Sequence, residues 1–269
     1  MVGRGYRSLA PFTLFAIILM LGFLAIGSPF ESMFYPSMFL ITLVFQTLAN
    51  MSFRSIGIDL PPGWKRSTSI HYSVAMILVS FHVAVATVIG GLVISSPIIF
   101  PFEAAALLIV AQVAQFGVGS FEEYTFRGYM LTATEIHGRK FSILFSSISF
   151  ASLHVFAVLP YGYPVESIIL FIINIFLGGV SLALIRLRTN SLIPPIAFHA
   201  SWNFFGYHVF GLMESEAALF DATYLMPDII VRFELGLIST AIFTVLILLL
   251  FFANYRSQKP DSDGQEISI

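Results

Sequence analysis

Three short polar patterns interrupt apolar stretches of this sequence, and the first consists of Glu122, Glu123 and Arg127 in "FEEYTFRG". An acid four residues before a base is the favoured order for an ion pair on a helix, so Arg127 is expected to neutralise Glu123. Glu122 is turned by about 100° from its neighbour on a helix, which leaves its carboxylate free. Each such charge costs roughly 2.5–3.5 kcal/mol at the centre of a bilayer, so the group needs either a chemical role or a place at the membrane interface.

The other two patterns each carry a histidine. "SFASLHVF" places Phe150 and His154 four residues apart, and "IAFHASWNFF" does the same for His199 and Asn203. Residues at this spacing project from one face of a helix. Taken singly, each pattern has a structural explanation: an anchor at a helix end for the charged group, packing for His154, and an interhelical polar clamp for His199 and Asn203.

Together the three patterns supply the groups that amide hydrolysis requires. A free glutamate beside a histidine can take a proton from water, and His and Asn side chains can donate the hydrogen bonds that stabilise a tetrahedral intermediate. Zinc ligation by His154, His199 and a glutamate is an open alternative, because a catalytic zinc site needs three ligands and a water. The chain has no HExxH pattern and no cysteine, so we favour chemistry without a metal or other cofactor.

The composition indicates the elements that must position these residues. The chain is 57% hydrophobic and only 10% charged, whereas soluble domains carry about 25% charged residues. Since a membrane span needs about 20 apolar residues, the sequence predicts an all-α, polytopic integral membrane protein with about eight transmembrane helices that enclose a polar cavity. The expected helices cover residues 10–27, 34–53, 71–95, 102–120, 141–159, 166–185, 192–211 and 233–253.

The positions of the charges predict the topology. If the N-terminus is cytoplasmic, the inner segments hold most of the 13 Lys and Arg residues, as the positive-inside rule requires. These residues are Arg4, Arg7, Arg54, Lys65, Arg66, Arg139, Lys140, Arg186, Arg188, Arg256 and Lys259. The outer segments then hold the acidic residues Glu31, Glu166, Glu214, Glu216, Asp221 and Asp228. We therefore expect cytoplasmic N- and C-termini, with the active site towards the cytoplasmic half of the membrane.

The domain organisation is simple. We expect one helical transmembrane domain over residues 1–255 and a polar cytoplasmic tail over 256–269. The first helix has the basic start and apolar core of a secretory signal, but more helices follow and "GSPFE" is a poor cleavage site, so we expect it to be retained.

In their order, the patterns EExxxR, FxxxH and HxxxN resemble the motifs of the CAAX prenyl protease and bacteriocin-processing (CPBP) family of intramembrane endopeptidases. The chain shows "EEYTFR" at 122–127, "FASLH" at 150–154 and "HASWN" at 199–203. The resemblance covers about residues 102–206, and the expected eight spans also fit the type II CAAX prenyl endopeptidase branch.

The resemblance implies hydrolysis of a peptide bond near the C-terminus of a prenylated CAAX-type protein or peptide. Glu122 is then the general base, and His154 helps it to bind and polarise the water. His199 and Asn203 form the oxyanion hole.

The resemblance also implies that Glu123, Arg127 and Phe150 support the geometry of the site or the substrate, with Arg127 near the substrate carboxylate. The implied partners are a lipidated or membrane-associated peptide substrate and membrane lipid, with no nucleic acid. Two other functions remain open from the sequence: a proton-coupled transporter that uses Glu122 and the histidines as a relay, and a non-catalytic scaffold or immunity-type membrane protein.

Overall fold

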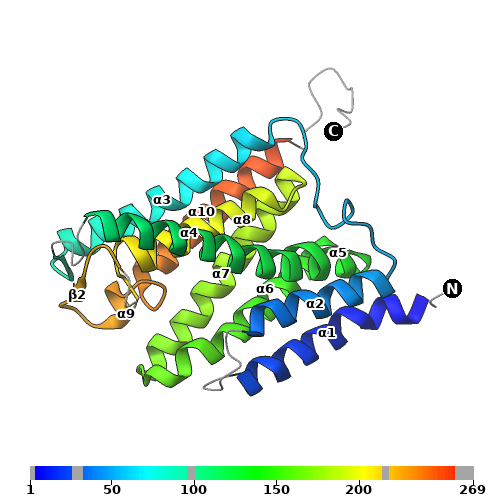
Figure 1. The fold of residues 1–269 in the computed structure, drawn as a ribbon, viewed down its shortest axis with the longest axis horizontal. Coiled ribbons are helices and arrows are strands. Elements are labelled where there is room, and N and C mark those ends of the chain that lie inside the picture. The colour runs from blue at the N-terminus through cyan, green and yellow to red at the C-terminus, as the bar shows by residue number, and fades with distance from the viewer. Residues whose placement is uncertain (1–3, 26–32, 96–100, 214–217, 258–269) are drawn as a thin grey trace.

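The computed structural model describes residues 4–25, 33–95, 101–213 and 218–257, and Figure 1 shows the arrangement of their elements. In chain order these are α1 (Arg4–Ala25), α2 (Phe34–Leu48), α3 (Trp64–Val88), β1 (Leu92–Ile94), α4 (Pro101–Glu123), the π-helical turn η2 (Tyr124–Met130), α5 (Leu131–Thr134), η3 (Glu135–His137), α6 (Arg139–Val158), η4 (Leu159–Tyr161), α7 (Val165–Thr189), α8 (Ile193–Asn203), the π-helical turn η5 (Phe204–Val209), β2 (Ala222–Tyr224), α9 (Asp228–Val231) and α10 (Leu237–Ser257). The predicted all-α fold is confirmed, since the described residues form only one small sheet of two short strands.

Within the described parts of the chain, four helical stretches are long and apolar enough to cross a membrane: Trp64–Val88, Ala105–His137, Arg139–Tyr161 and Val165–Thr189. Three shorter apolar helices accompany them: Leu9–Ala25, Phe34–Leu48 and Leu237–Ala253. Large apolar side chains point outward along the bundle, as Val88, Phe102 and Val113 show with exposed fractions of 85%, 86% and 67%. So wide an apolar surface fits contact with lipid and identifies an integral membrane protein.

The expected span 192–211 takes a different form. Helix α8 has 11 residues and passes directly into the six-residue η5. Pro194 and Pro195 stand in the first turn of α8, where the missing N–H groups cost least. The count of eight spans stays a prediction.

Two of the motifs, EExxxR and HxxxN, adjoin a change of helical geometry. The turn η2 begins at the residue after Glu123, and η5 begins at the residue after Asn203. π-Helical turns are rare and are frequently found at functional sites. The two irregular turns therefore mark the same region as the sequence motifs.

The bundle has two distinct ends, which helix α3 connects (Figure 1). At one end the loop before α3 meets the loop before α8, where the Leu192 N–H donates to the Gly57 carbonyl across 2.9 Å. At the other end β1, which follows α3, pairs antiparallel with β2, with Leu92 opposite Tyr224. Since α3 has 25 residues, these ends are separated by about 37 Å at 1.5 Å per residue.

Two apolar clusters fill the interior. One is centred on α1, α2, η2 and α6 and includes Phe126 and Phe150. The other is centred on α3, α8 and α10 and includes Phe198 and Trp202. Phe150 and Trp202 line one small cavity between the clusters, so the polar motifs lie where the two clusters meet.

Several residues used in the topology prediction lie outside the described residues. These are Glu31, Glu214, Glu216 and Lys259, together with the tail from residue 258 onward; the side chains of Arg4, Arg7 and Arg256 are also outside the description.

Candidate active site

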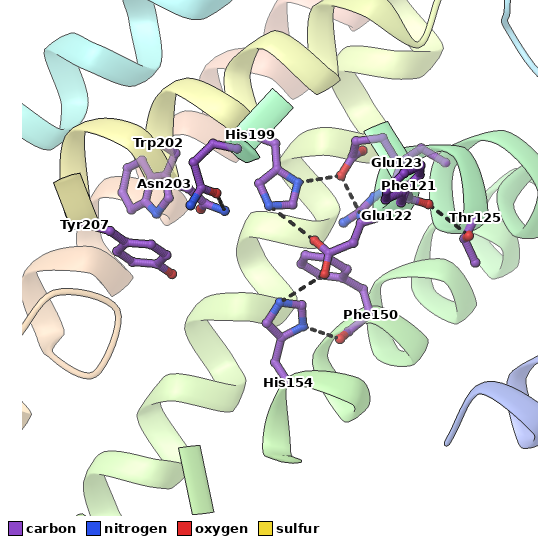
Figure 2. Close-up of polar contacts among 12 residues, drawn as sticks. Phe121, Glu122, Glu123, Thr125, Phe150, His154, His199, Trp202, Asn203 and Tyr207 are labelled. Carbon is purple, nitrogen blue, oxygen red and sulfur yellow. Dashed lines mark hydrogen bonds and ion pairs between the residues drawn. The ribbon is translucent and has the colours of Figure 1, made fainter. Parts of the chain in front are cut away.

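The three sequence motifs come together in space (Figure 2). Glu122 lies at the end of α4, His154 on α6, and His199 and Asn203 on α8. Helices α4 and α8 pack against each other, and α6 contacts η2, the direct continuation of α4. The predicted site residues therefore share one location although up to 81 positions separate them in the sequence (203 − 122).

Glu122 lies between the two imidazoles. Its Oε1 is 3.9 Å from Nε2 of His154, and its Oε2 is 3.4 Å from Nε2 of His199. The Glu122 residue is only 1% exposed, and its Oε2 has no hydrogen-bond partner within the described part of the chain. A separation of 3.9 Å is too long for a direct hydrogen bond, but one water can bridge it.

The ring of His154 is held by its own helix. Its Nδ1 lies 2.9 Å from the Phe150 carbonyl oxygen, which can only accept a hydrogen bond, so Nδ1 carries the proton. In the neutral ring, Nε2 then presents its lone pair towards Glu122. Two acceptors face each other across the gap, and a bridging water can donate one hydrogen to each of them.

Glu123 is the centre of a second set of contacts. Its Oε1 accepts from Nη1 of Arg127 at 3.0 Å and from Nδ1 of His199 at 3.0 Å. Both members of the Glu123–Arg127 pair have fully buried side chains. The ion pair predicted from the i, i+4 spacing is present, and it also fixes the orientation of the His199 ring.

Phe150 packs among three of these polar groups. Cζ of Arg127 lies 4.1 Å from the centre of its ring, which is a cation–π contact. The same ring is 4.4 Å from the ring of His154 and meets the ring of His199 edge to face at 5.9 Å. The Phe150 ring therefore contacts the guanidinium and both imidazoles and helps to hold all three in place.

Asn203 is oriented by a polar relay from α4. Its Nδ2 donates to Oε1 of Gln115 at 3.1 Å, and Nε2 of Gln115 lies 3.0 Å from Nε2 of His208. One N–H of the Asn203 amide is thus engaged by Gln115, and the second is available to a ligand. Asn203 also contributes to the wall of the largest cavity at the site.

Glu234 is a buried acid that sequence reasoning missed. It is 3% exposed, accepts from the Trp202 indole N–H at 2.7 Å and from the Tyr207 hydroxyl at 2.9 Å, and has a left-handed backbone with φ 60°. The sequence signal that could have identified Glu234 as a functional candidate is its position as an ionisable residue inside the expected span 233–253. Nothing in the motif pattern links it to Trp202 and Tyr207, because the contact depends on how the segment between α9 and α10 packs against α8 and η5.

A cavity of about 380 Å³ joins these groups. Its polar wall includes Glu122, His154, Asn203, Tyr207 and Glu234. The remaining wall is largely aromatic and apolar, with Tyr35, Tyr161, Tyr163, Phe171 and Met213. A second pocket between α1, α2 and α6 also reaches Glu122 and His154, and Phe34, Leu153 and Phe156 give it an apolar wall. The structure thus has the predicted polar cavity.

The described residues contain no group of three or more His, Cys, Asp or Glu arranged to hold a metal ion.

Comparison with known proteins gives one family. Residues 101–205 match the family model described as "Type II CAAX prenyl endopeptidase Rce1-like". A search of curated proteins finds no match to the chain. The matched region runs from the start of α4 into η5 and contains all three motifs. The resemblance recognised from the motifs is therefore confirmed: over residues 101–205 the chain is similar to the Rce1-like type II CAAX prenyl endopeptidases, a family of proteases whose substrates are membrane-associated.

Proposed function

We propose that this protein is an intramembrane endopeptidase that hydrolyses a peptide bond near the C-terminus of a lipidated or membrane-associated peptide, with a prenylated CAAX-type C-terminus as the model substrate. The observation that carries the proposal is the position of the Glu122 carboxylate, which lies between His154 and His199 on the wall of a cavity. This arrangement provides a base, a water site and an electrophilic donor around one point.

In the proposed first step, a water lies between Glu122 Oε1 and His154 Nε2 and donates a hydrogen to each. Its lone pairs then point away from both acceptors and towards the scissile carbonyl carbon. Glu122 takes the proton as the water oxygen bonds to that carbon, which generates a tetrahedral intermediate. General-base catalysis of this kind contributes typically 10²–10⁴-fold to a rate.

His199 and Asn203 stabilise the oxyanion in this scheme. Because Nδ1 of His199 donates to Glu123, the ring offers a second N–H at Nε2 only as an imidazolium. The available N–H of the Asn203 amide is the other donor. When the intermediate collapses, the C–N bond breaks and the protonated Glu122 returns its proton to the leaving amine.

The supporting residues balance the charge of the site. Glu122 and Glu123 are negative, whereas Arg127 and the protonated His199 are positive, so the buried group is neutral overall. Buried charges are tolerated when they are paired in this way. We assign Glu123, Arg127 and Phe150 to positioning, because their contacts are to other site residues.

We also propose the topology that the charge distribution favours. Both termini are cytoplasmic, with residues 256–269 as a cytoplasmic tail and the helices up to residue 255 as one membrane domain. Catalysis needs no metal in this proposal.

The test uses purified protein in detergent and a farnesylated CAAX peptide, with and without a zinc chelator, followed by mass spectrometry. Release of the C-terminal tripeptide in both samples is the expected result. Release that stops with the chelator and returns with added zinc would contradict the metal-free mechanism, and intact peptide in every sample would contradict the proposed reaction.

A further inference from the structure

Glu234 is a carboxylate of the cavity wall that the proposed mechanism does not use. It lies in the segment between α9 and α10 and lines both the large cavity and the small cavity beside Phe150 and Trp202. The residue is only 3% exposed. A buried ionisable group in a membrane domain is costly, and for that reason it is a candidate for function.

Both oxygens of Glu234 accept hydrogen bonds. The Trp202 indole N–H donates to Oε1 at 2.7 Å, and the Tyr207 hydroxyl donates to Oε2 at 2.9 Å. Acceptance at both oxygens is the pattern of an ionised carboxylate, in which each oxygen can take about two hydrogen bonds. Each oxygen therefore keeps a lone pair for a further donor, beyond its partner in the described part of the chain.

The charge of Glu234 is not balanced by any Lys or Arg side chain that the structure describes. Its two donors are neutral groups, and the neighbouring cations are engaged elsewhere: Arg127 pairs with Glu123 at 3.0 Å, and Arg232 pairs with Asp228 at 3.1 Å. Buried charges in proteins are usually paired or bind a metal ion. Because the catalytic group described above is neutral overall, Glu234 gives the cavity a net negative charge.

The backbone of Glu234 is held in a strained turn. Its φ is 60°, and the Leu235 N–H donates to the Phe233 carbonyl across 2.7 Å. A γ-turn with positive φ is rare and strained. The Asn174 amide donates to the Glu234 carbonyl at 2.8 Å, and the Glu234 N–H donates to Oγ of Ser239 at 3.1 Å. Side chains of α7 and α10 thus fix the backbone that presents this carboxylate to the cavity.

The wall around Glu234 suits an organic cation. Because the Tyr207 hydroxyl gives its hydrogen to Glu234, its oxygen can only accept from a ligand. Aromatic faces attract cations through their negative electrostatic potential. The aromatic residues that complete the wall are Tyr35, Tyr161, Tyr163 and Phe171.

We propose that Glu234 and Tyr207 form a binding site for a protonated amine, such as a lysine side chain of the bound peptide. An ammonium group brings hydrogen-bond donors to the carboxylate and to the tyrosine oxygen, together with the positive charge that balances Glu234. The cavity volume of about 380 Å³ lies in the usual range of ligand pockets, about 300–1,000 Å³.

This site makes Glu234 a specificity-determining residue of the proposed peptidase, whose preferred substrate carries a lysine close to the scissile bond. The word substrate rests on the proposed function, whereas binding of the amine does not.

The first measurement compares the binding of farnesylated CAAX-type peptides that carry either lysine or Nε-acetyl-lysine. One pair has the variable residue directly before the farnesylated cysteine, and a second pair has it at the C-terminus. Acetylation removes the positive charge, and a ketomethylene group in place of the scissile amide prevents cleavage. Trp202 donates to Glu234, so its emission in a Trp64→Phe background reports binding. In at least one pair, the lysine peptide is expected to bind about 10-fold tighter.

Glu234→Gln removes the charge and keeps the shape of the side chain, so it should bind the two peptides of each pair equally. Glu166→Gln, at an exposed carboxylate on the first turn of α7, is the matched control and should keep the preference. Equal binding within both pairs by the wild-type protein would overturn the inference. An unchanged preference in Glu234→Gln would also overturn it.

A second measurement uses the wild-type side chain at Glu234 and stays decisive if Glu234→Gln fails to fold. Dicyclohexylcarbodiimide activates a buried carboxylate, which then forms an amide with a primary amine in contact, while the carbodiimide takes up the water as its urea. With the lysine peptide bound, mass spectrometry should find the peptide attached to Glu234. Attachment to Glu122 alone, or no attachment of a bound lysine peptide, would contradict the site.

Neither measurement requires catalysis. A protein that binds the amine at Glu234 and leaves the cleavable CAAX peptide intact would refute the proposed function alone. Cleavage of that peptide without any preference for the lysine peptides would refute the amine site alone.

Discussion

His199 donates from Nδ1 to Oε1 of Glu123 across 3.0 Å, and this contact turns its Nε2 to within 3.4 Å of Oε2 of Glu122. One imidazole therefore joins both carboxylates of the EE pair. The pair is not redundant: Glu123 holds Arg127 and His199, whereas Glu122 faces the cavity and retains an acceptor atom without a hydrogen-bond partner among the described residues.

The buried ion pair is expected to carry a large part of the stability of the site. Arg127→Met removes the guanidinium that pairs with Glu123, while the contact of Glu123 with His199 remains, and breaking a buried pair from one side costs about 3–5 kcal/mol. Arg54→Met is the matched control, because Arg54 is 85% exposed and pairs with Asp59 at the surface, where such a pair is worth about 0–1 kcal/mol. Thermal unfolding in detergent measures both variants. Equal unfolding temperatures for the two would contradict the assigned role of Arg127.

Gly179 is expected to be required for the position of Arg127. A Cβ at this residue would lie 3.1 Å from Nη2 of Arg127 and 3.1 Å from Cβ of Ser147, and overpacking of this kind costs about 1–3 kcal/mol. Gly179→Ala should therefore lower both the unfolding temperature and the peptidase rate.

The control for this prediction is Gly117→Ala on α4. A Cβ there has no neighbouring atom within 4 Å, and replacement of a helical glycine by alanine stabilises by up to about 1 kcal/mol. If Gly179→Ala and Gly117→Ala have the same unfolding temperature and the same peptidase rate, the close packing at Gly179 does not position the guanidinium of Arg127.

Glu234 is expected to organise the wall of the cavity that faces α8. Glu234→Leu leaves the Trp202 indole and the Tyr207 hydroxyl without their acceptor, at about 1–3 kcal/mol for each buried donor. Glu234→Gln keeps one acceptor oxygen and should cost less. Unfolding temperatures rank the variants, and Trp202 emission in a Trp64→Phe background reports the local change, since the chain has two tryptophans. A leucine variant as stable as the wild type would show that these contacts are dispensable.

The Asn203 side chain is expected to stabilise the transition state more than it contributes to substrate binding. Removal of one oxyanion donor lowers kcat by about 10²–10³-fold, so Asn203→Ala should reduce kcat and leave KM nearly unchanged. Gln115→Leu removes the partner that orients the amide and should give a smaller decrease in kcat. Steady-state kinetics with the CAAX peptide separates the two parameters, and a change confined to KM would assign Asn203 to substrate binding.

The sequence predicted which residues of the motifs lie together better than it predicted their surroundings. The i, i+4 spacing alone predicted the contact between Glu123 and Arg127, because that contact is local to one helical turn. The convergence of Glu122, His154 and His199 was predictable only as a set, since the three residues lie on separate helices.

Other features depend on tertiary structure. The approach of Glu234 to Trp202 results from how the segment between α9 and α10 packs against α8, for which no local pattern exists. The expectation of a regular span at 192–211 did not anticipate the π-helical turn after Asn203.

The most direct test of the account is the rate of CAAX-peptide cleavage by Glu122→Gln. The substitution keeps the size of the side chain but removes the base, and a loss of about 10²–10⁴-fold is expected. Glu166→Gln, the same change at an exposed carboxylate on the first turn of α7, should cleave at the wild-type rate. Cleavage by Glu122→Gln at the rate of Glu166→Gln would contradict the assignment of Glu122 as the general base.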